Sequence, residues 1–263
     1  MRSGLPEKPT GSFDNDWVPR DYLEEFYIGR VVADEQLAVR YQIELLRRLT
    51  QVGQHPISCM LEFGCGPTMH RAIAAAPYVT ELHLADYLDS NLKEIERWLD
   101  NEPTSFNWNH YTRYILTLEG NVPTADAISQ REYETRKKVT RLIQANAGNK
   151  QPLGKEGKGT YPVVLSYFCA DSATGDKKIW ERYMRNIASL VKPGGVFTVA
   201  ALAECFAYRT REQYFPSANV TLEDIIRVLS IDFDRETIYS ELCHLPEHAE
   251  QGYVGILLAN ANK

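Results

Sequence analysis

The segment 61–68, LEFGCGPT, ends a short apolar run that begins at Ile57 and stops at a Gly-x-Gly turn. A short apolar run stopped by glycine is expected of a strand buried on both faces of a sheet. Glycines let the backbone approach a ligand where a Cβ would collide. Ligands of a parallel sheet bind beyond the carboxyl ends of its strands, so this turn is where a nucleotide-like cofactor is expected. Taken alone, the same glycines would also suit an ordinary tight turn.

Strands and helices alternate along most of the chain on either side of this turn. Apolar residues at helical spacing predict helices at 21–27, 34–49, 69–76, 89–100, 176–191 and 222–229. Short apolar runs predict further strands at 81–85, 163–168, 196–201, 237–243 and 253–259. This alternation is typical of an α/β fold with a doubly wound, mostly parallel sheet, and the last strands are expected to pair as an antiparallel hairpin.

The chain is expected to form one domain, because 263 residues with 44% hydrophobic content can bury a single large core. Residues 1–15 are expected to form a disordered lead-in, since the first ten are rich in Gly, Pro and Lys. The domain then spans 16–263, with two helices in 16–55 before the first strand. The segment 101–160 is less regular and is interpreted as an inserted elaboration of the domain.

Charge and cysteine content argue against several classes of function. The formal net charge of -6 and the pI near 5.6 provide no basic surface for a phosphate backbone, so no nucleic-acid partner is expected. The five cysteines form no CxxC pair, which favours reduced thiols in a cytoplasmic protein. No apolar stretch approaches the roughly 20 residues of a bilayer span, so no membrane partner is expected. The six histidines are scattered along the chain, and no metal site is expected.

The residues around the glycine turn favour one cofactor class over another. The second strand ends at Asp86, about twenty residues beyond the glycines, where a carboxylate can accept hydrogen bonds from both ribose hydroxyls. Nicotinamide dinucleotides require a third glycine, and here Pro67 and Thr68 follow Gly66. Glu62 would repel a pyrophosphate, yet it can orient the cationic sulfonium cofactor S-adenosylmethionine. The alternative role for Glu62 is that of a capping carboxylate in the turn.

A series of motifs after about residue 16 carries a family resemblance. They are Pro19-Arg20-Asp21-Tyr22-Leu23-Glu24 with Tyr27, Gly64-Cys65-Gly66-Pro67-Thr68, Asp86-Tyr87, Asn91-Leu92 with Trp98-Leu99, Leu118-Glu119-Gly120, Gln151-Pro152-Leu153-Gly154, Leu165-Ser166 with Asp171, and Lys192-Pro193-Gly194-Gly195. In this order they resemble the nicotinamide, phenylethanolamine and indolethylamine N-methyltransferase family. The resemblance implies a class I methyltransferase (Rossmann-like) fold in which 16–55 forms an N-terminal helical cap.

The resemblance also implies a set of residues that contact S-adenosylmethionine. They are Tyr22, Tyr27, Glu62, Gly64, Cys65, Gly66, Thr68, Asp86, Tyr87, Asn91, Asn146 and Ala147. The two early tyrosines would close over cofactor and substrate, and the glycine turn would contact the methionine part. Asp86 and Asn91 would hold the ribose, although Asn91 could instead make only a local backbone bond. Asn146 stands where the family commonly has an aspartate, so it keeps an acceptor for the adenine amine without the negative charge.

The acceptor site differs from the family pattern at one position. Asp171, which follows the strand 163–168, is expected to hold an amine or take its proton, and with Tyr27 it is a catalytic candidate; the alternative is a loop or capping carboxylate. Ala201 stands where the family places an acidic substrate anchor, which argues against nicotinamide and catecholamine-type acceptors. Glu204, three residues later, is a candidate replacement. The weaker pocket candidates are Tyr208 and Ser217.

Together these observations predict a monomeric methyltransferase that moves the methyl group of S-adenosylmethionine to a small-molecule amine or N-heterocycle. The expected reaction is an in-line displacement that needs alignment and exclusion of water, but neither a protein nucleophile nor a metal. Two alternatives stay open. One is an O- or S-methyltransferase built on the same frame, and the other is a protein that binds the cofactor without transferring the methyl group.

Overall fold

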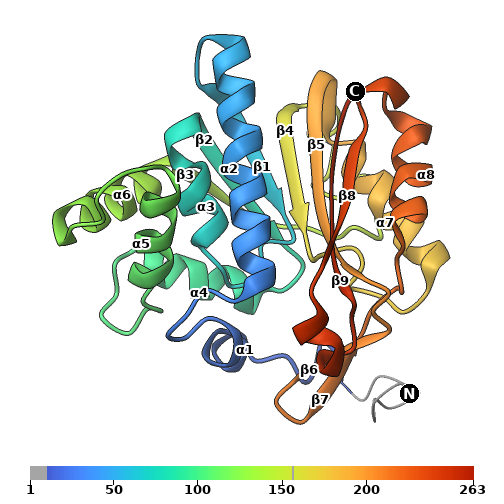
Figure 1. The fold of residues 1–263 in the computed structure, drawn as a ribbon, viewed down its shortest axis with the longest axis horizontal. Helices are drawn as coiled ribbons and strands as arrows, with labels where there is room; N and C mark the ends of the chain where they lie inside the picture. Colours follow the sequence, from blue (N-terminus) through green and yellow to red (C-terminus); the bar gives the residue numbers. More distant parts are fainter. Residues whose placement is uncertain (1–10, 156) are drawn as a thin grey trace.

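A seven-stranded sheet lies at the centre of the computed structural model, which describes residues 11–155 and 157–263 (Figure 1). The strands are β1 (Ile57–Phe63), β2 (Val79–Asp86), β3 (Val139–Gln144), β4 (Tyr161–Tyr167), β5 (Val191–Ala203), β8 (Tyr239–His244) and β9 (Gly255–Asn262). They lie in the order β3-β2-β1-β4-β5-β9-β8. β9 is antiparallel to both neighbours, while the other strands run parallel to one another. The predicted doubly wound sheet with an antiparallel last strand is confirmed.

Helices cover both faces of this sheet, with α2 (Ala33–Gly53) and α3 (His70–Ala75) on one side and α7 (Lys177–Ala188) and α8 (Leu222–Asp232) on the other (Figure 1). The remaining helices are α1 (Pro19–Phe26), α4 (Asp89–Leu99), α5 (Asn109–Leu118), α6 (Ala125–Lys138), η1 (Ala76–Tyr78), η2 (Arg235–Thr237) and η3 (Pro246–Gln251). Within 11–155 and 157–263, no helix is both long and apolar enough to cross a bilayer.

The alternation of β1 explains how the glycine turn is held. Leu61 and Phe63 pack into the apolar cluster that contains Trp180 of α7, whereas Met60 packs with α2 and α3 on the opposite face. A strand buried on both faces has a fixed register, so its carboxyl end is fixed as well. Gly64 follows with φ +75°, and a Cβ added there would lie 2.1 Å from Cys169 Sγ. Only glycine fits at that position.

The segment 101–160 contributes more to the fold than the expected insertion would. Its strand β3 is the edge of the central sheet and pairs in parallel with β2, with Asp86 opposite Gln144. The sequence of β3, VTRLIQ, is only partly buried, which is why no continuous apolar run marks it. Because β3 ends beside Asp86, the residues after it enter the same edge of the sheet as the glycine turn.

The carboxyl edge of the sheet is covered by α1 and by a two-stranded sheet of β6 (Ala207–Thr210) and β7 (Gln213–Pro216) (Figure 1). This second sheet was not predicted from the sequence. α2 packs on the sheet face instead, so the cap expected over 16–55 consists of α1 and the residues next to it. The expected disordered lead-in is not observed for 11–15, where Phe13 packs 4.8 Å from Phe215 between ring centroids. Its first ten residues lie outside the described part of the chain.

Candidate functional site

A cavity of about 920 Å³ lies beyond the carboxyl ends of β1, β2, β4 and β5, beneath α1 and the β6–β7 hairpin. Among the residues predicted to contact the cofactor, those that line it are Tyr22, Tyr27, Gly64, Cys65, Gly66, Thr68, Asp86, Tyr87, Asn91, Asn146 and Ala147. Segments far apart in the sequence therefore meet around one space. The dimensions are those of small-molecule and cofactor sites, which enclose roughly 300–1,000 Å³.

Asp86 is the buried carboxylate at the centre of one end of the cavity. Its Oδ2 accepts a hydrogen bond from the backbone N of Gly66 at 2.8 Å. Its Oδ1 accepts from Leu88 N and from Asn91 Nδ2, both at 2.9 Å. Burial raises the pKa of Asp86 even though these donors oppose the shift. Asn91 Oδ1 in turn accepts from Trp17 Nε1 at 2.8 Å, so Asn91 joins Asp86 to the segment that covers the cavity.

The loop after β3 forms the wall next to Asp86. Asn146 Oδ1 accepts a hydrogen bond from Gly148 N at 2.7 Å, and Asn186 Nδ2 donates to the carbonyl of Ala147 at 2.7 Å. The amide oxygen of Asn146 therefore holds its own loop in shape, in addition to the adenine contact predicted for it. Ala145 N donates to the carbonyl of Asp86 at 2.8 Å, which fixes the loop to the end of β2.

A buried ionic cluster under α1 was missed by the sequence reading. Arg71 Nη2 donates to both carboxylate oxygens of Glu35 at 2.8 Å, and His70 Nε2 lies 3.0 Å from Glu35 Oε2. Tyr27 Oη donates to Glu35 Oε1 at 2.7 Å and lies 3.2 Å from Tyr22 Oη. The sequence offered one sign of this cluster: the polar pair His70-Arg71 lies shortly after the glycine turn, at the start of a helix whose other residues are apolar.

The protonation states in this cluster follow from burial and pairing. Burial opposes ionisation of Glu35, but Arg71 and His70 outweigh it and lower the pKa of Glu35 to about 2. Burial lowers the pKa of His70 to about 4 and raises that of Tyr22 to about 12. Burial likewise raises the pKa of Tyr27, so its phenol stays protonated. Tyr27 can therefore donate a hydrogen bond and position other groups, but it is a poor general base.

Asp34 is another acidic residue that lines the cavity, and no sequence motif had indicated it. Asp34 Oδ2 accepts from Tyr253 Oη at 3.0 Å, and its Oδ1 accepts from Glu35 N at 2.8 Å. The ring of His248 contacts the same Tyr253 hydroxyl. Burial raises the pKa of Asp34, and His248 opposes the shift. Tyr208, predicted as a pocket residue, also lines the cavity.

Three of the four predicted substrate residues do not line the cavity. Asp171 is buried, and its Oδ2 accepts from Leu202 N at 3.0 Å, so it positions Leu202, which does line the cavity. Burial raises the pKa of Asp171 to about 6. Ser217 is buried outside the lining. Glu204 is exposed and has φ +55°, so it does not replace the acid missing at Ala201, whose side chain packs in the apolar core.

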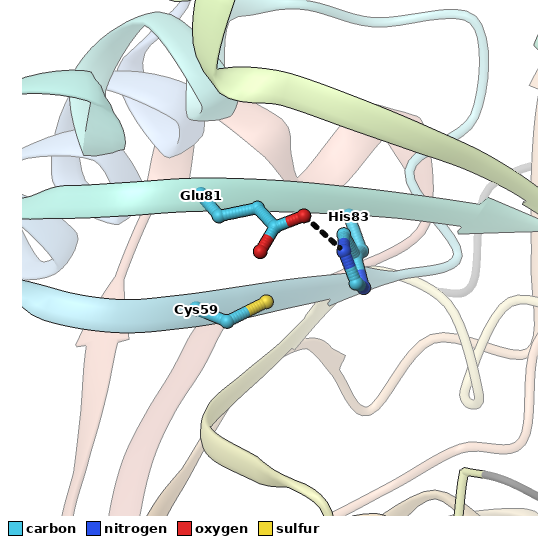
Figure 2. Close-up of side chains that lie close together, drawn as sticks. All are labelled: Cys59, Glu81 and His83. Carbon is cyan, nitrogen blue, oxygen red and sulfur yellow. Dashed lines mark hydrogen bonds and ion pairs between the residues drawn. The ribbon is translucent and has the colours of Figure 1, made fainter.

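Glu62 also lies behind the glycine turn and does not line the cavity. It is 1% exposed, and its Oε2 has no hydrogen-bond partner among the residues that the structure describes. Burial raises its pKa to about 8, although the charge of Arg71 opposes the shift. The histidines were expected to form no set with carboxylates and thiols, yet His83 lies beside Glu81 and Cys59, away from the cavity (Figure 2).

The chain matches proteins of known family over most of its length. The NNMT/PNMT/TEMT family matches residues 9–251. Nicotinamide N-methyltransferase of Homo sapiens is 31% identical over 82% of this chain and 81% of its own, and phenylethanolamine N-methyltransferase of Bos taurus is 25% identical over 93% and 88%. In fold, the chain resembles magnesium protoporphyrin IX methyltransferase of Synechocystis, solved with S-adenosylmethionine, with a TM-score of 0.51 and 13% identity over 92% and 90% of the two chains. The chain thus belongs to the NNMT/PNMT/TEMT family, as its motifs predicted.

Proposed function

We propose that this protein transfers the methyl group of S-adenosylmethionine to a small-molecule amine or N-heterocycle bound at the Asp34 end of the cavity. The observation that carries the proposal is the shared cavity. The glycine turn and Asp86 line it where β1 and β2 end, whereas Tyr253, which donates a hydrogen bond to Asp34, precedes β9, three strands away from β1 in the sheet. Tyr208 lines the same cavity. Membership of a family of N-methyltransferases supports the same reaction.

The residues around Asp86 fit the cofactor. Gly66 has φ +58°, and a Cβ added there would meet no atom within 4 Å, so the backbone of the turn borders open space. Asp86 lines that space, and its carboxylate is held by hydrogen bonds from Gly66 N, Leu88 N and Asn91 Nδ2. A carboxylate placed in this way can accept a hydrogen bond from a ribose hydroxyl that displaces one of these donors. The loop after β3 lies on the side of Asp86 where the adenine would follow.

The chemistry needs alignment more than acid–base groups. When bound, S-adenosylmethionine supplies a sulfonium methyl group that a lone pair can attack in line. Tyr22 and Tyr27 line the same cavity as the glycine turn. Because their pKa values are raised, both phenols stay neutral and can orient bound groups by hydrogen bonding. Trp17, Phe13 and Phe215 pack on one another, and Phe13 and Trp17 line the cavity with apolar rings, which favours exclusion of water.

The acceptor class follows from the groups around Asp34. Asp34 lies near His248, and its oxygens already accept two protein hydrogen bonds. A ligand N–H or ammonium group is what such an acceptor can still bind. Asp34 thus takes the anchoring role that the family resemblance assigned to the position of Ala201. An amine that arrives protonated can leave its proton on this carboxylate.

Cofactor binding and acceptor profiling test the proposal. Titration calorimetry with S-adenosylhomocysteine is expected to show binding in the wild type and its loss in Asp86→Ala. Asp89→Ala is the matched control because Asp89 is exposed and its ion pair is with Lys93 on the surface. The wild type is then assayed with amines, N-heterocycles, phenols and thiols. Turnover of phenols or thiols alone would replace the proposal with O- or S-methylation. Cofactor binding without turnover of any acceptor would favour a binding protein.

A further inference from the structure

Cys59, Glu81 and His83 bring three potential metal ligands together outside the cavity. Cys59 of β1 lies directly opposite Glu81 of β2 in the sheet register, and His83 is two residues further along β2 on the same face. The thiol sulfur, a carboxylate oxygen and an imidazole nitrogen all lie within 4.8 Å of one another. Figure 2 shows the side chains of the two strands side by side on one face of the sheet.

The second contact of His83 matches the environment of a metal-binding histidine. Its Nε2 lies 3.0 Å from Glu81 Oε1, and its Nδ1 lies 2.8 Å from the hydroxyl of Tyr161 on β4. A metal-bound histidine commonly donates its other ring N–H to an oxygen, which fixes the orientation of the ring. Tyr161 can fill that role, and the nitrogen that faces Glu81 is then the one available to a metal.

We propose that Cys59, Glu81 and His83 bind a Zn²⁺ ion through Sγ, a carboxylate oxygen and Nε2, with water as the fourth ligand. Thiolate, imidazole and carboxylate are the ligands of zinc, at distances of about 2.0–2.3 Å, which place the donor atoms about 3.3–3.8 Å apart. Small side-chain rotations suffice to reach this spacing from the present one. The Glu81 side chain is 40% exposed, which gives the ion and its water a path from solvent.

Binding at this site must be coupled to proton release. The ion replaces the thiol proton of Cys59, and with Nε2 bound to the metal, Nδ1 of His83 donates its hydrogen bond to the Tyr161 hydroxyl oxygen. One proton is therefore released for each ion bound, and affinity falls as the pH falls.

The position of the site assigns it a structural role. β1 continues from Cys59 into the Gly64–Gly66 turn, and β2 continues from His83 to Asp86. An ion bound between β1 and β2 holds the two strands together just before they reach the cavity. A ligand that binds only the folded chain stabilises it by mass action, so the ion is expected to raise the unfolding temperature by roughly 5 °C at one hundred times its Kd.

The test is a cobalt titration of the full chain after treatment with a chelator, because Co²⁺ gives a thiolate charge-transfer absorption. The wild type is expected to bind one equivalent with this absorption, to release about one proton, and to lose the absorption when Zn²⁺ is added. Cys59→Ser removes the absorption, whereas Cys243→Ser keeps it, since Cys243 is a comparable partly buried thiol on β8. Glu81→Gln, at an exposed ligand, keeps the absorption and weakens Co²⁺ binding about tenfold or more.

Circular dichroism and S-adenosylhomocysteine binding confirm that each variant is folded. The proposal is overturned if the folded wild type shows no thiolate absorption with Co²⁺. It is also overturned if Cys59→Ser keeps the absorption of the wild type, or if Glu81→Gln binds Co²⁺ as tightly as the wild type. None of these readouts depends on methyl transfer, so the site and the proposed enzymatic activity can fail separately.

Discussion

Replacing Glu35 by glutamine tests whether the buried cluster under α1 is a stabilised ion pair. Glutamine keeps the volume of the side chain but leaves the guanidinium of Arg71, buried with 4% exposure, without its carboxylate partner. Breaking a buried ion pair from one side costs about 3–5 kcal/mol, because the remaining charge is uncompensated. With a urea m-value of about 3 kcal/mol/M, the unfolding midpoint is expected to fall by roughly 1–1.7 M.

The control for this prediction is the exposed pair Lys93–Asp89, with a distance of 2.6 Å and both side chains more than half exposed. Asp89→Asn is expected to cost less than about 1 kcal/mol, since exposed pairs are worth little. The double variant Glu35→Leu with Arg71→Met removes both charges and is expected to recover most of the stability that Glu35→Gln loses. A midpoint for Glu35→Gln that equals that of Asp89→Asn in urea would refute the reasoning.

Three further predictions concern individual carboxylates. The raised pKa of Glu62, about 8 against 4.5, means that the folded state binds a proton more tightly than the unfolded state. Stability is therefore expected to fall between pH 4.5 and 8 by at most about 1.4 kcal/mol per unit, and Glu62→Gln should flatten this slope in urea titrations at several pH values. Asp34→Asn is expected to raise the KM of an amine acceptor about 10–100-fold and leave S-adenosylhomocysteine affinity unchanged; an unaltered KM would rule out Asp34 as the anchor. Asp171→Ala removes the acceptor of the buried Leu202 N–H, so thermal unfolding should show a loss of about 1–3 kcal/mol; a loss below half a kcal/mol would contradict this role.

The order of elements and the end of the cavity at Asp86 could be predicted because local patterns determine both. The strand before Gly64 had to be apolar to be buried on both faces, and the glycines had to follow it for steric reasons. Asp86 was found because it ends the next strand. The same logic failed for β3, whose edge position leaves it too polar to produce an apolar run.

The end of the cavity at Asp34 could not be predicted because its residues come from distant segments without a motif. Asp34 and Tyr253 are 219 positions apart and meet only through the packing of α2 against the loop before β9. Asp171 and Glu204 follow strands at the ligand edge, yet the backbone turns their side chains into the protein or out to solvent. Position along a strand gives the edge of the sheet at which a residue lies, but the direction of its side chain depends on tertiary contacts.

The hydrogen bond between Trp17 and Asn91 has a consequence for the timing of turnover. The segment 11–17 lines the cavity, and through Asn91 it is attached to the carboxylate expected to hold the ribose. If the proposed transfer requires this segment to move when substrates load and products leave, the rate of that movement sets an upper limit on kcat.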